Sequence, residues 1–231
     1  MIGAVAVVIP ARDESELVGR CLESVLAAKD RIGSDVAVSI TVVADQCTDD
    51  TAEVARRYPG VTVVEIGAGN VGLARATGVM LALESSGRLP DLVWVASTDA
   101  DSVVPVDWLL EQVRLARRGA GVVLGTVRPD FDDLDAEQAL AWTALHTGDS
   151  ALGEVHGANL GVRADVYLAV GGFPGLAEHE DVTFVERCAA LGADIVATER
   201  CEVTTSGRQI GRTPGGFARY LRDDLLPNHA L

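Results

Sequence analysis

Two patterns of hydrophobic and polar residues alternate along the first half of the chain. Short uninterrupted apolar runs, such as residues 4–9, are followed by stretches in which apolar residues recur every three or four positions. In the stretch 14–28 this spacing places Leu17, Cys21 and Val25 on one helical face. Strands that alternate with helices predict a doubly wound α/β fold with a mainly parallel sheet. The lack of polar residues within the runs predicts strands that helices cover on both faces.

The pattern predicts five strands and four helices in this half. The expected strands are 4–9, 36–44, 61–66, 92–97 and 121–127, and the expected helices are 14–28, 49–58, 70–83 and 106–118.

The second half of the chain differs in character. Residues 130–149 predict an acidic loop and a helix, residues 155–195 predict short strands and helices around lone polar residues, and residues 204–217 predict a basic, glycine-rich loop. No linker or repeat separates the halves. We therefore expect a single domain, with a first half 1–128, a second half 129–204, and a C-terminal part 205–231 made of a mobile loop and a helix.

Composition limits the classes of function. The formal net charge is −15 and the sequence pI is about 4.5, whereas binding to nucleic acid or to an anionic membrane needs a basic surface. Neither partner is expected. Hydrophobic residues make up 48% of the chain, and aromatic residues only 4%, so the core must be built mainly from aliphatic side chains.

The cysteines and the N-terminus bear on the cellular compartment. Cys21, Cys47, Cys188 and Cys201 form no close pair, so neither a disulfide framework nor a zinc site is expected. The segment 1–12 lacks the basic n-region of a signal peptide, and its apolar run is far shorter than the ~20 residues of a membrane span. We expect a cytoplasmic protein with no transmembrane segment.

The loops after the strands are the first place to look for a ligand. In doubly wound sheets ligands bind at the carboxyl ends of the strands, which here means residues 10–14, 45–50, 67–75 and 98–104, all rich in Gly, Asp, Asn or Arg.

One of these loops contains a dinucleotide-binding fingerprint. Gly67, Gly69 and Gly72 match G-x-G-x-x-G, which favours a nicotinamide or flavin enzyme. The motif follows the third expected strand rather than the first. The acid expected about 20 residues later falls at Asp91, before the next strand rather than at its far end. An oxidoreductase is therefore kept only as an alternative.

The segment STDADSVVP (97–105) places Asp99 and Asp101 directly after an apolar strand. Alternate side chains of an extended segment point to the same side, so both carboxylates can reach one cation. Mg²⁺ and Mn²⁺ prefer oxygen ligands, often one or two carboxylates together with substrate phosphate oxygens. A solvated acidic turn is the other interpretation of this pair.

Five stretches, taken in order, resemble the family 2 glycosyltransferases of the A-type, nucleotide-sugar-binding fold. They are VVIPARDE (7–14), VVADQCTDDT (42–51), GNVGLARATG (69–78), STDADSVVP (97–105) and GANLGVRADVYLAVGGFPGLAEHEDVTFVERC (157–188). The chain departs from the family pattern at Asp13, where Asn is commoner, and at Gln46 and Cys47, where Gly and Ser are usual.

The resemblance implies an enzyme that moves a sugar from a nucleoside diphosphate sugar to a hydroxyl acceptor with Mn²⁺ or Mg²⁺. Inversion is expected, and a retaining variant of the same fold stays open as the alternative. Residues 1–128 would bind the donor and residues 129–204 the acceptor. Asp101 would be the metal ligand, and Asp99 would contact the metal or the ribose. The other implied donor-site residues are Pro10, Arg12, Glu14, Asp45, Arg75 and Asn159, the last of these facing either sugar.

The acceptor chemistry is implied to lie in the Glu180–Asp181 pair, with Asp181 as the general base that deprotonates the acceptor hydroxyl. His156 or His179 would be a third metal ligand, unless both are structural. We also expect Arg208 and Arg212, on the glycine-rich loop, to close over the donor diphosphate.

Each of these roles has a structural alternative. Asp13 or Ser15 would cap the first helix and Asp45 its own turn, and Arg75 would form a surface ion pair. Glu180 and Asp181 would simply stabilise the first turn of a helix through its dipole.

Two further functions stay open beside the glycosyltransferase. One is a nucleotidyltransferase that makes nucleotide sugars, although the loop PARDESE (10–16) lacks the glycine that its signature requires. The other is a non-catalytic sugar-nucleotide-binding domain. A homodimer is compatible with the sequence, which identifies neither the donor's base and sugar nor the acceptor.

Overall fold

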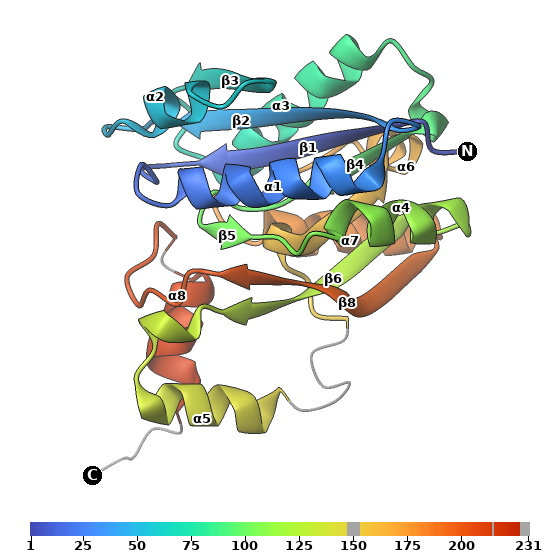
Figure 1. The fold of residues 1–231 in the computed structure, drawn as a ribbon. Coiled ribbons are helices and arrows are strands. Elements are labelled where there is room, and N and C mark those ends of the chain that lie inside the picture. The colour runs from blue at the N-terminus through green and yellow to red at the C-terminus, as the bar shows by residue number, and fades with distance from the viewer. Residues whose placement is uncertain (147–152, 214, 227–231) are drawn as a thin grey trace.

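The computed structural model describes residues 1–146, 153–213 and 215–226. Within these residues eight strands form one sheet, in the order β3-β2-β1-β4-β7-β6-β8-β5 (Figure 1). The strands are β1 (Ala4–Ala11), β2 (Ala37–Asp45), β3 (Val61–Ile66), β4 (Val93–Ser97), β5 (Ser102–Val103), β6 (Val122–Pro129), β7 (Leu160–Arg163) and β8 (Ile195–Thr205).

Helices connect the strands and cover both faces of the sheet. The α-helices are α1 (Val18–Ile32), α2 (Thr51–Arg56), α3 (Val71–Ser86), α4 (Trp108–Arg117), α5 (Ala136–Leu145), α6 (Ala164–Ala169), α7 (Glu180–Leu191) and α8 (Phe217–Arg219). Short 3₁₀ turns are η1 (Pro90–Leu92), η2 (Phe131–Asp133) and η4 (Gly157–Asn159), and a π-helical turn η5 (Tyr220–Asp224) continues α8.

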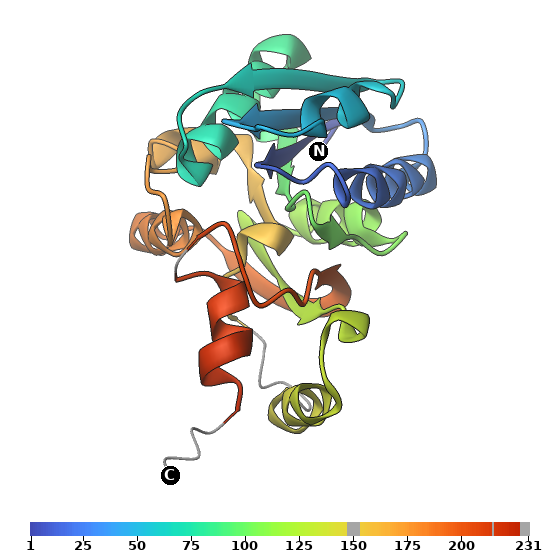
Figure 2. The same ribbon diagram turned by 90° about the vertical axis from the view of Figure 1, so that its left-hand side faces the viewer.

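Strand β1 shows why the apolar runs carry no polar residues. Every residue of β1 is buried. Its side chains alternate between two hydrophobic clusters: Val7 packs on the side of α1 and α4, and Val8 on the side of α3, α6 and α7. The sheet is therefore the middle layer of three (Figures 1 and 2), and the predicted doubly wound α/β class is confirmed.

The sheet is mainly parallel with an antiparallel strand in its interior. β1 pairs in parallel with β2 and β4, β2 with β3, and β6 with β8. β7 is antiparallel to both of its neighbours, β4 and β6, and β5 is antiparallel to β8. Because β7 lies between β4 and β6, it joins the strands of the two halves of the chain into one sheet.

The first helix begins four residues later than the pattern predicts. The carbonyl of Glu14 accepts from the amides of Leu17 and Val18 in a turn before α1, and Asp13 has φ = 52°. Helix α1 has no side-chain cap. The alternative interpretation of Asp13 or Ser15 as its cap is therefore wrong, because Asp13 instead accepts from the amide and hydroxyl of Thr48.

A small second cluster joins the end of the chain to helix α5. Trp142 packs with the buried Leu221 and Leu225, and Gln138 donates to the carbonyl of Leu221. Part of the expected 130–149 helix and of the expected C-terminal helix lies in 147–152 and 227–231, outside the described residues. None of the helices among the described residues is long and apolar enough for a membrane crossing.

Candidate active site

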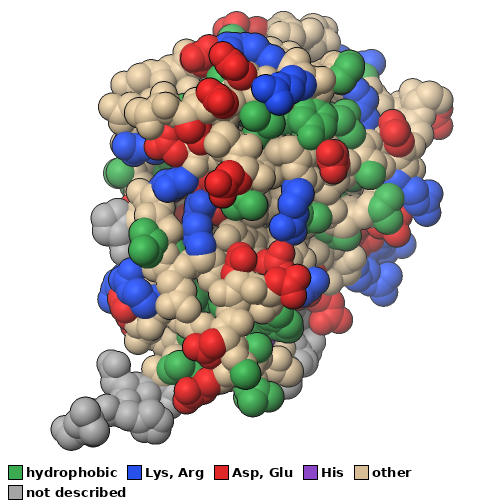
Figure 3. All heavy atoms as spheres, turned by 60° about the vertical axis from the view of Figure 1, so that its left-hand side comes forward, with side chains coloured by type: hydrophobic (Ala, Val, Ile, Leu, Met, Phe, Trp, Pro, Cys, Tyr) green, Lys and Arg blue, Asp and Glu red, His purple; other side chains and the backbone are tan. Residues whose placement is uncertain are grey.

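A cavity of about 720 Å³ lies at the edge of the sheet where β1, β2 and β4 end. Figure 2 looks onto this edge. Side chains from both halves of the chain line the cavity, among them Pro10, Arg12, Glu14, Asp45, Arg75, Asp99, Asp101, His156, His179, Glu180, Asp181, Arg208 and Arg212. The structure therefore brings together almost all of the residues that the sequence nominates. Figure 3 shows acidic and basic side chains interspersed on this face.

Arg208 connects the loop after β1 to the Asp-x-Asp turn. Its guanidinium makes a bidentate pair with Glu14, at 2.8 and 2.6 Å, and its Nη2 lies 2.9 Å from Oδ2 of Asp101. Arg212 adds a second link, from its Nε to the carbonyl of Arg12 at 3.0 Å. The glycine-rich segment 206–213 is thereby held over the carboxyl end of β1. Because a diphosphate is a bidentate acceptor like a carboxylate, these two guanidinium groups are suited to binding one.

Asp101 is a partly buried acid in a polar setting. Its Oδ1 accepts from the hydroxyl groups of Thr205 and Ser102. Burial, and next the negative charge of Asp99, raise the pKa of Asp101 to about 6, although Arg208 opposes this shift.

The backbone around the two acids differs from the prediction. Residues 99–102 form a turn closed by a hydrogen bond from the amide of Ser102 to the carbonyl of Asp99, not an extended segment. The two carboxylates nevertheless line the same cavity.

Arg75 lies between the two acidic groups of the site. Its side chain is only 3% exposed. Nη2 contacts Asp99 at 2.6 Å, Nε contacts Glu180 at 2.9 Å, and Nη1 donates to the hydroxyl of Ser97 at 2.5 Å. The interpretation of Arg75 as a surface ion pair is wrong, because this arginine is buried. Its guanidinium instead fixes the Asp-x-Asp turn relative to the start of α7.

Asp45 is held by the glycine-rich loop. Its carboxylate accepts from the amides of Gly69, at 2.8 Å, and Asn70, at 2.6 Å, so it does not cap its own turn. The residue is 3% exposed and borders the cavity. Asp45 thus orients the motif that opens α3, and any contact with a nucleotide base would use its remaining lone pairs.

Asp181 is positioned by two backbone amides. Oδ2 accepts from Gly157 at 2.6 Å, and Oδ1 accepts from Val182 at 2.8 Å. Each oxygen keeps a lone pair, so the carboxylate can still accept a proton. The neighbouring Glu180 is 4% exposed, and burial raises its pKa despite the opposing charge of Arg75.

Asn159 is the nominated residue that does not reach the cavity. Its amide nitrogen donates to the carbonyls of Thr126 and Cys201, and its oxygen accepts from the indole of Trp108. It is 1% exposed. The interpretation of Asn159 as a sugar ligand is therefore not supported, since these contacts join β6, β8 and α4 and occupy its polar atoms.

The residues of the Asp-x-Asp turn fit a hard divalent cation by their chemistry. Asp99 and Asp101 offer carboxylate oxygens, as Mg²⁺ and Mn²⁺ prefer, and both line the same cavity. Arg208 occupies one oxygen of Asp101, so a cation would have to share or displace that contact.

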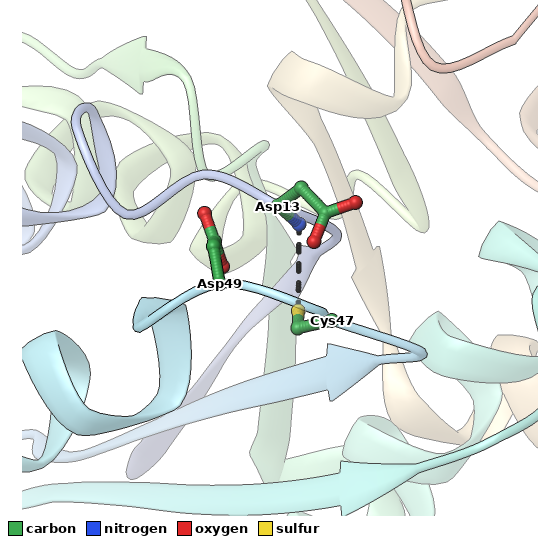
Figure 4. Close-up of side chains that lie close together, drawn as sticks. All are labelled: Asp13, Cys47 and Asp49. Carbon is green, nitrogen blue, oxygen red and sulfur yellow. Dashed lines mark hydrogen bonds between the residues drawn. The ribbon is translucent and has the colours of Figure 1, made fainter.

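Another group of potential ligands lies nearby. Among the described residues, Asp13, Cys47 and Asp49 alone form a tight set of three metal-ligating side chains (Figure 4). These atoms have structural partners: Cys47 accepts from the amide of Asp13, and Asp49 from the amides of Ser15 and Thr51. The set therefore stabilises the loops after β1 and β2. Neither His156 nor His179 joins Asp99 and Asp101 in such a set within the described residues.

The sequence analysis missed one part of the cavity wall. Trp142, His146, Phe217 and Tyr220 line it from α5, α8 and η5. Only 4% of the chain is aromatic, so aromatic residues near both ends of the second half were a signal that could have been followed. Their meeting depends on contacts between segments about 75 residues apart along the chain, which no local pattern records.

Comparison with known proteins places the chain in a defined group. The model of the family described as glycosyl transferase family 2 matches residues 6–150, more than half of the chain. Among curated proteins, 4,4'-diaponeurosporenoate glycosyltransferase of Staphylococcus aureus is 41% identical over 63 residues, which are 27% of this chain and 15% of that protein.

Solved structures share the fold along most of the chain. TarS 1-349 of S. aureus has a TM-score of 0.64 at 15% identity, over 90% of this chain and 61% of that one. The mannosyltransferase PcManGT of Pyrobaculum calidifontis, in complex with GDP-Man and Mn²⁺, has a TM-score of 0.64 at 21% identity, over 91% and 58%.

A third structure is glucosyl-3-phosphoglycerate synthase of Mycobacterium tuberculosis with Mg²⁺ and uridine diphosphate. Its TM-score is 0.54 at 19% identity, over 88% of this chain and 69% of that one. At these identities the likeness shows the fold. The chain spans less than two thirds of the length of the first two structures and a much smaller part of the curated relative.

Proposed function

Because the chain belongs to glycosyl transferase family 2, we propose that it transfers a sugar from a nucleoside diphosphate sugar to a hydroxyl acceptor, with inversion and with the aid of Mn²⁺ or Mg²⁺. One observation supports this most: Arg75 holds an acid of the Asp-x-Asp turn and the Glu180–Asp181 pair against the same cavity. Two structural relatives are described with a nucleotide or nucleotide sugar and a divalent cation, which supports the same assignment.

The donor half would bind the nucleoside diphosphate. Arg208 and Arg212 would transfer their hydrogen bonds from Glu14 and the backbone to the diphosphate oxygens. Asp101 and Asp99 would hold a divalent cation, which supplies positive charge to the departing diphosphate. The released Glu14 would then be free to accept from a donor hydroxyl.

The acceptor half would carry out proton transfer. The acceptor oxygen forms the new bond to the anomeric carbon while the bond from that carbon to the phosphate oxygen breaks, and the electron pair of that bond goes to the diphosphate. Asp181 takes the proton of the acceptor hydroxyl as the new bond forms. Its two amide contacts keep the carboxylate in place during this transfer. A single displacement of this kind inverts the anomeric centre.

The first test measures donor binding. We expect one of a set of nucleoside diphosphate sugars to raise the melting temperature in the presence of Mn²⁺, since a ligand bound only by the folded state stabilises it. Asp101→Asn should remove the Mn²⁺-dependent part of the shift. Asp107→Asn, an exposed acid paired with Arg31, serves as the control. A shift with NAD or FAD and with none of the sugar nucleotides would overturn the proposal.

The second test addresses the base. Asp181→Asn should keep donor binding and lower turnover by about 10²- to 10⁴-fold, the usual range for loss of a general base. Asp165→Asn is the matched control, because Asp165 also lies in the first turn of a helix but does not line the cavity. If the two changes lower turnover equally, Asp181 is not the base and only stabilises the first turn of its helix.

A third test concerns the arginine that bridges Glu14 and Asp101. Arg208→Ala should raise the Michaelis constant for the donor by about tenfold or more, as expected for a lost charge-assisted bidentate contact. Arg219→Ala, an exposed arginine paired with Asp223, should have no such effect. An unchanged donor Michaelis constant and turnover in Arg208→Ala would remove Arg208 from the donor site.

A further inference from the structure

Aromatic side chains gather at one end of the cavity. The chain has three Trp, three Tyr and four Phe residues, and Trp142, Phe217 and Tyr220 meet beside the ring of His146. The His146 ring stacks on Trp142, with centroids 3.6 Å apart and an angle of 8°. Phe217 and Tyr220 stand edge-on to Trp142 at 5.6 and 6.2 Å. We call His146, Phe217 and Tyr220, with Trp142 behind them, the aromatic wall.

The aromatic wall is more than a piece of core. Trp142 is 6% exposed and belongs to the cluster with Leu221 and Leu225, but Phe217 and Tyr220 are only half-buried and line the cavity. The other aromatic group of the protein, Tyr167 with two phenylalanines, is buried and lines no part of the cavity. Half-buried rings that face a cavity are the usual lining of a small-molecule site.

The charges of the cavity are divided between its two ends. Of its four lining arginines, Arg75 and Arg208 are paired with acids, Arg212 bonds to the backbone of the loop after β1, and Arg12 belongs to that loop. Beside the aromatic wall the ionisable lining residues are instead Glu154, Glu178 and Asp181 with His156 and His179. The guanidinium of Arg75 borders this end beside Gly157, but it is already paired with Asp99 and Glu180.

Contacts tie these acids to the aromatic wall and to the base. The ring of His156 lies 6.3 Å from that of Phe217 and its Nε2 lies 3.3 Å from Glu154. The next residue, Gly157, donates its amide to Asp181. The aromatic wall, the acids and the catalytic carboxylate therefore border one continuous space.

We propose that this end of the cavity binds an uncharged carbohydrate as the acceptor, with a sugar ring packed on the aromatic wall and its hydroxyl groups donating to the nearby carboxylates. This inference rests on the proposed function. The C–H groups on one face of a sugar ring carry partial positive charge and suit the negative face of an aromatic ring, and carboxylates are strong acceptors for hydroxyl groups.

Two other acceptor classes fit less well. A phosphorylated or carboxylated acceptor would bring negative charge close to Glu154, Glu178 and Asp181. The guanidinium of Arg75 is already paired with Asp99 and Glu180, and like charges in contact oppose binding. An aliphatic alcohol would cover the acids without giving them hydrogen-bond partners, which has a free-energy cost.

Kinetics with a panel of acceptors tests the proposal. The panel contains methyl glycosides of common hexoses, the corresponding sugar phosphates and a linear aliphatic alcohol. We expect transfer to a methyl glycoside and at least tenfold lower kcat/KM for the sugar phosphate. Phe217→Leu and Tyr220→Leu each keep an apolar side chain but remove a ring. Each should raise the acceptor KM by about 2- to 10-fold, the range set by the strength of aromatic contacts, with the donor KM unchanged.

Phe131 provides the control for the two ring variants. Phe131→Leu changes a partly exposed ring that lies beside Arg128 and outside the cavity, so its acceptor KM should not move. The proposal is overturned if the sugar phosphate or the alcohol is the better acceptor, or if neither ring variant changes the acceptor KM. Melting temperatures of the variants separate loss of binding from loss of folding.

A binding measurement distinguishes failure of this inference from failure of the proposed function. Trp94 and Trp108 are fully buried, so a change in intrinsic fluorescence on adding a methyl glycoside should come from Trp142 and be lost in Trp142→Phe. A fluorescence response without any hydrolysis or transfer of a sugar nucleotide would refute the proposed function but keep the carbohydrate site. Transfer to a charged acceptor, with no fluorescence response to methyl glycosides, would refute this inference alone.

Discussion

Arg75 shows how one residue couples the two parts of the site. The family resemblance implies that Arg75 belongs to the donor site. In the structure, Arg75 bonds to Ser97, Asp99 and Glu180, and its side chain is almost wholly buried. A buried charge is stable only when its partners surround it. Arg75 therefore sets the position of Asp99 relative to Glu180, and this role is separate from any contact with the donor.

Arg75→Lys should lower the free energy of unfolding by about 3 kcal/mol, because a single ammonium cannot make all three contacts and leaves a buried acid without its full partner. Denaturant unfolding measures the change. In the matched control Arg56→Lys, an exposed pair with Glu65, the change should be below about 1 kcal/mol. Equal losses of unfolding free energy in the two variants would show that the buried contacts of Arg75 stabilise the protein no more than an exposed ion pair does.

Residue types at the site were predictable, whereas their pairings were not. The order of motifs pointed to Asp99, Asp101, Glu180 and Asp181, and all four line one cavity. The pair of Arg208 with Glu14 joins residues 194 positions apart, and no local pattern encodes such a contact. Asn159 was misjudged for a related reason, since its partners come from three distant elements.

At the scale of elements, the start of helix α3 explains two of the three glycines of the GAGNVG loop. Asn70 caps the helix by accepting from the amide of Leu73, and Gly69 has φ = 59°. A Cβ on Gly72 would overlap the carbonyl oxygen of Pro174, whereas one on Gly67 would meet nothing within 4 Å. Gly69 therefore serves a turn and Gly72 a close backbone contact, roles that a G-x-G-x-x-G match alone does not distinguish from dinucleotide binding.

Gly72→Ala should destabilise the protein by about 1–3 kcal/mol, the usual cost of overpacking, since backbone atoms must shift to make room. Gly67→Ala, in the same motif, should stay within about 1 kcal/mol of the wild type. The melting temperatures of the two variants measure this difference. If Gly67→Ala lowers the melting temperature more than Gly72→Ala does, then Gly72 is not required for the close packing of α3 on residues 174–176.

The five strands predicted in the first half match the observed strands to within two residues at each end. Strand β3 has the bounds that the pattern gives, and β1 extends the predicted run by two residues. The start of α1 was missed because the loop before it is fixed by Thr48 and Thr51, which come from the next loop of the fold. The antiparallel placement of β7 was not predicted either, because strand order depends on the whole sheet.

At the scale of the whole molecule, burial separates the four cysteines into two classes. Cys21, Cys188 and Cys201 are buried, and Cys47 is partly exposed. Burial raises the pKa of Cys188 to about 11 and that of Cys201 to about 12, and it also raises the pKa of Cys21. A thiol that is both protonated and covered by core side chains does not react as a nucleophile.

One thiol per chain should therefore react with a disulfide reagent in the folded protein at pH 8, and four should react after unfolding. The three buried thiols should react slower than Cys47 by on the order of a thousandfold, because access needs opening of the core. Cys47→Ser should remove the fast phase. Rapid reaction of two or more thiols in the folded state would contradict the described core.

Strand β7 also has a consequence for how the chain must be made. The family match ends at residue 150, yet the strand that fills the place between β4 and β6 begins at Leu160. On the ribosome, β4 and β6 are both synthesised before β7, the strand that pairs with each of them. Until β7 emerges, the unpaired backbone groups at their edges can pair with the wrong strand. A fragment cut at the boundary of the match would keep those edges permanently. A useful expression boundary therefore lies beyond Thr205, where β8 ends.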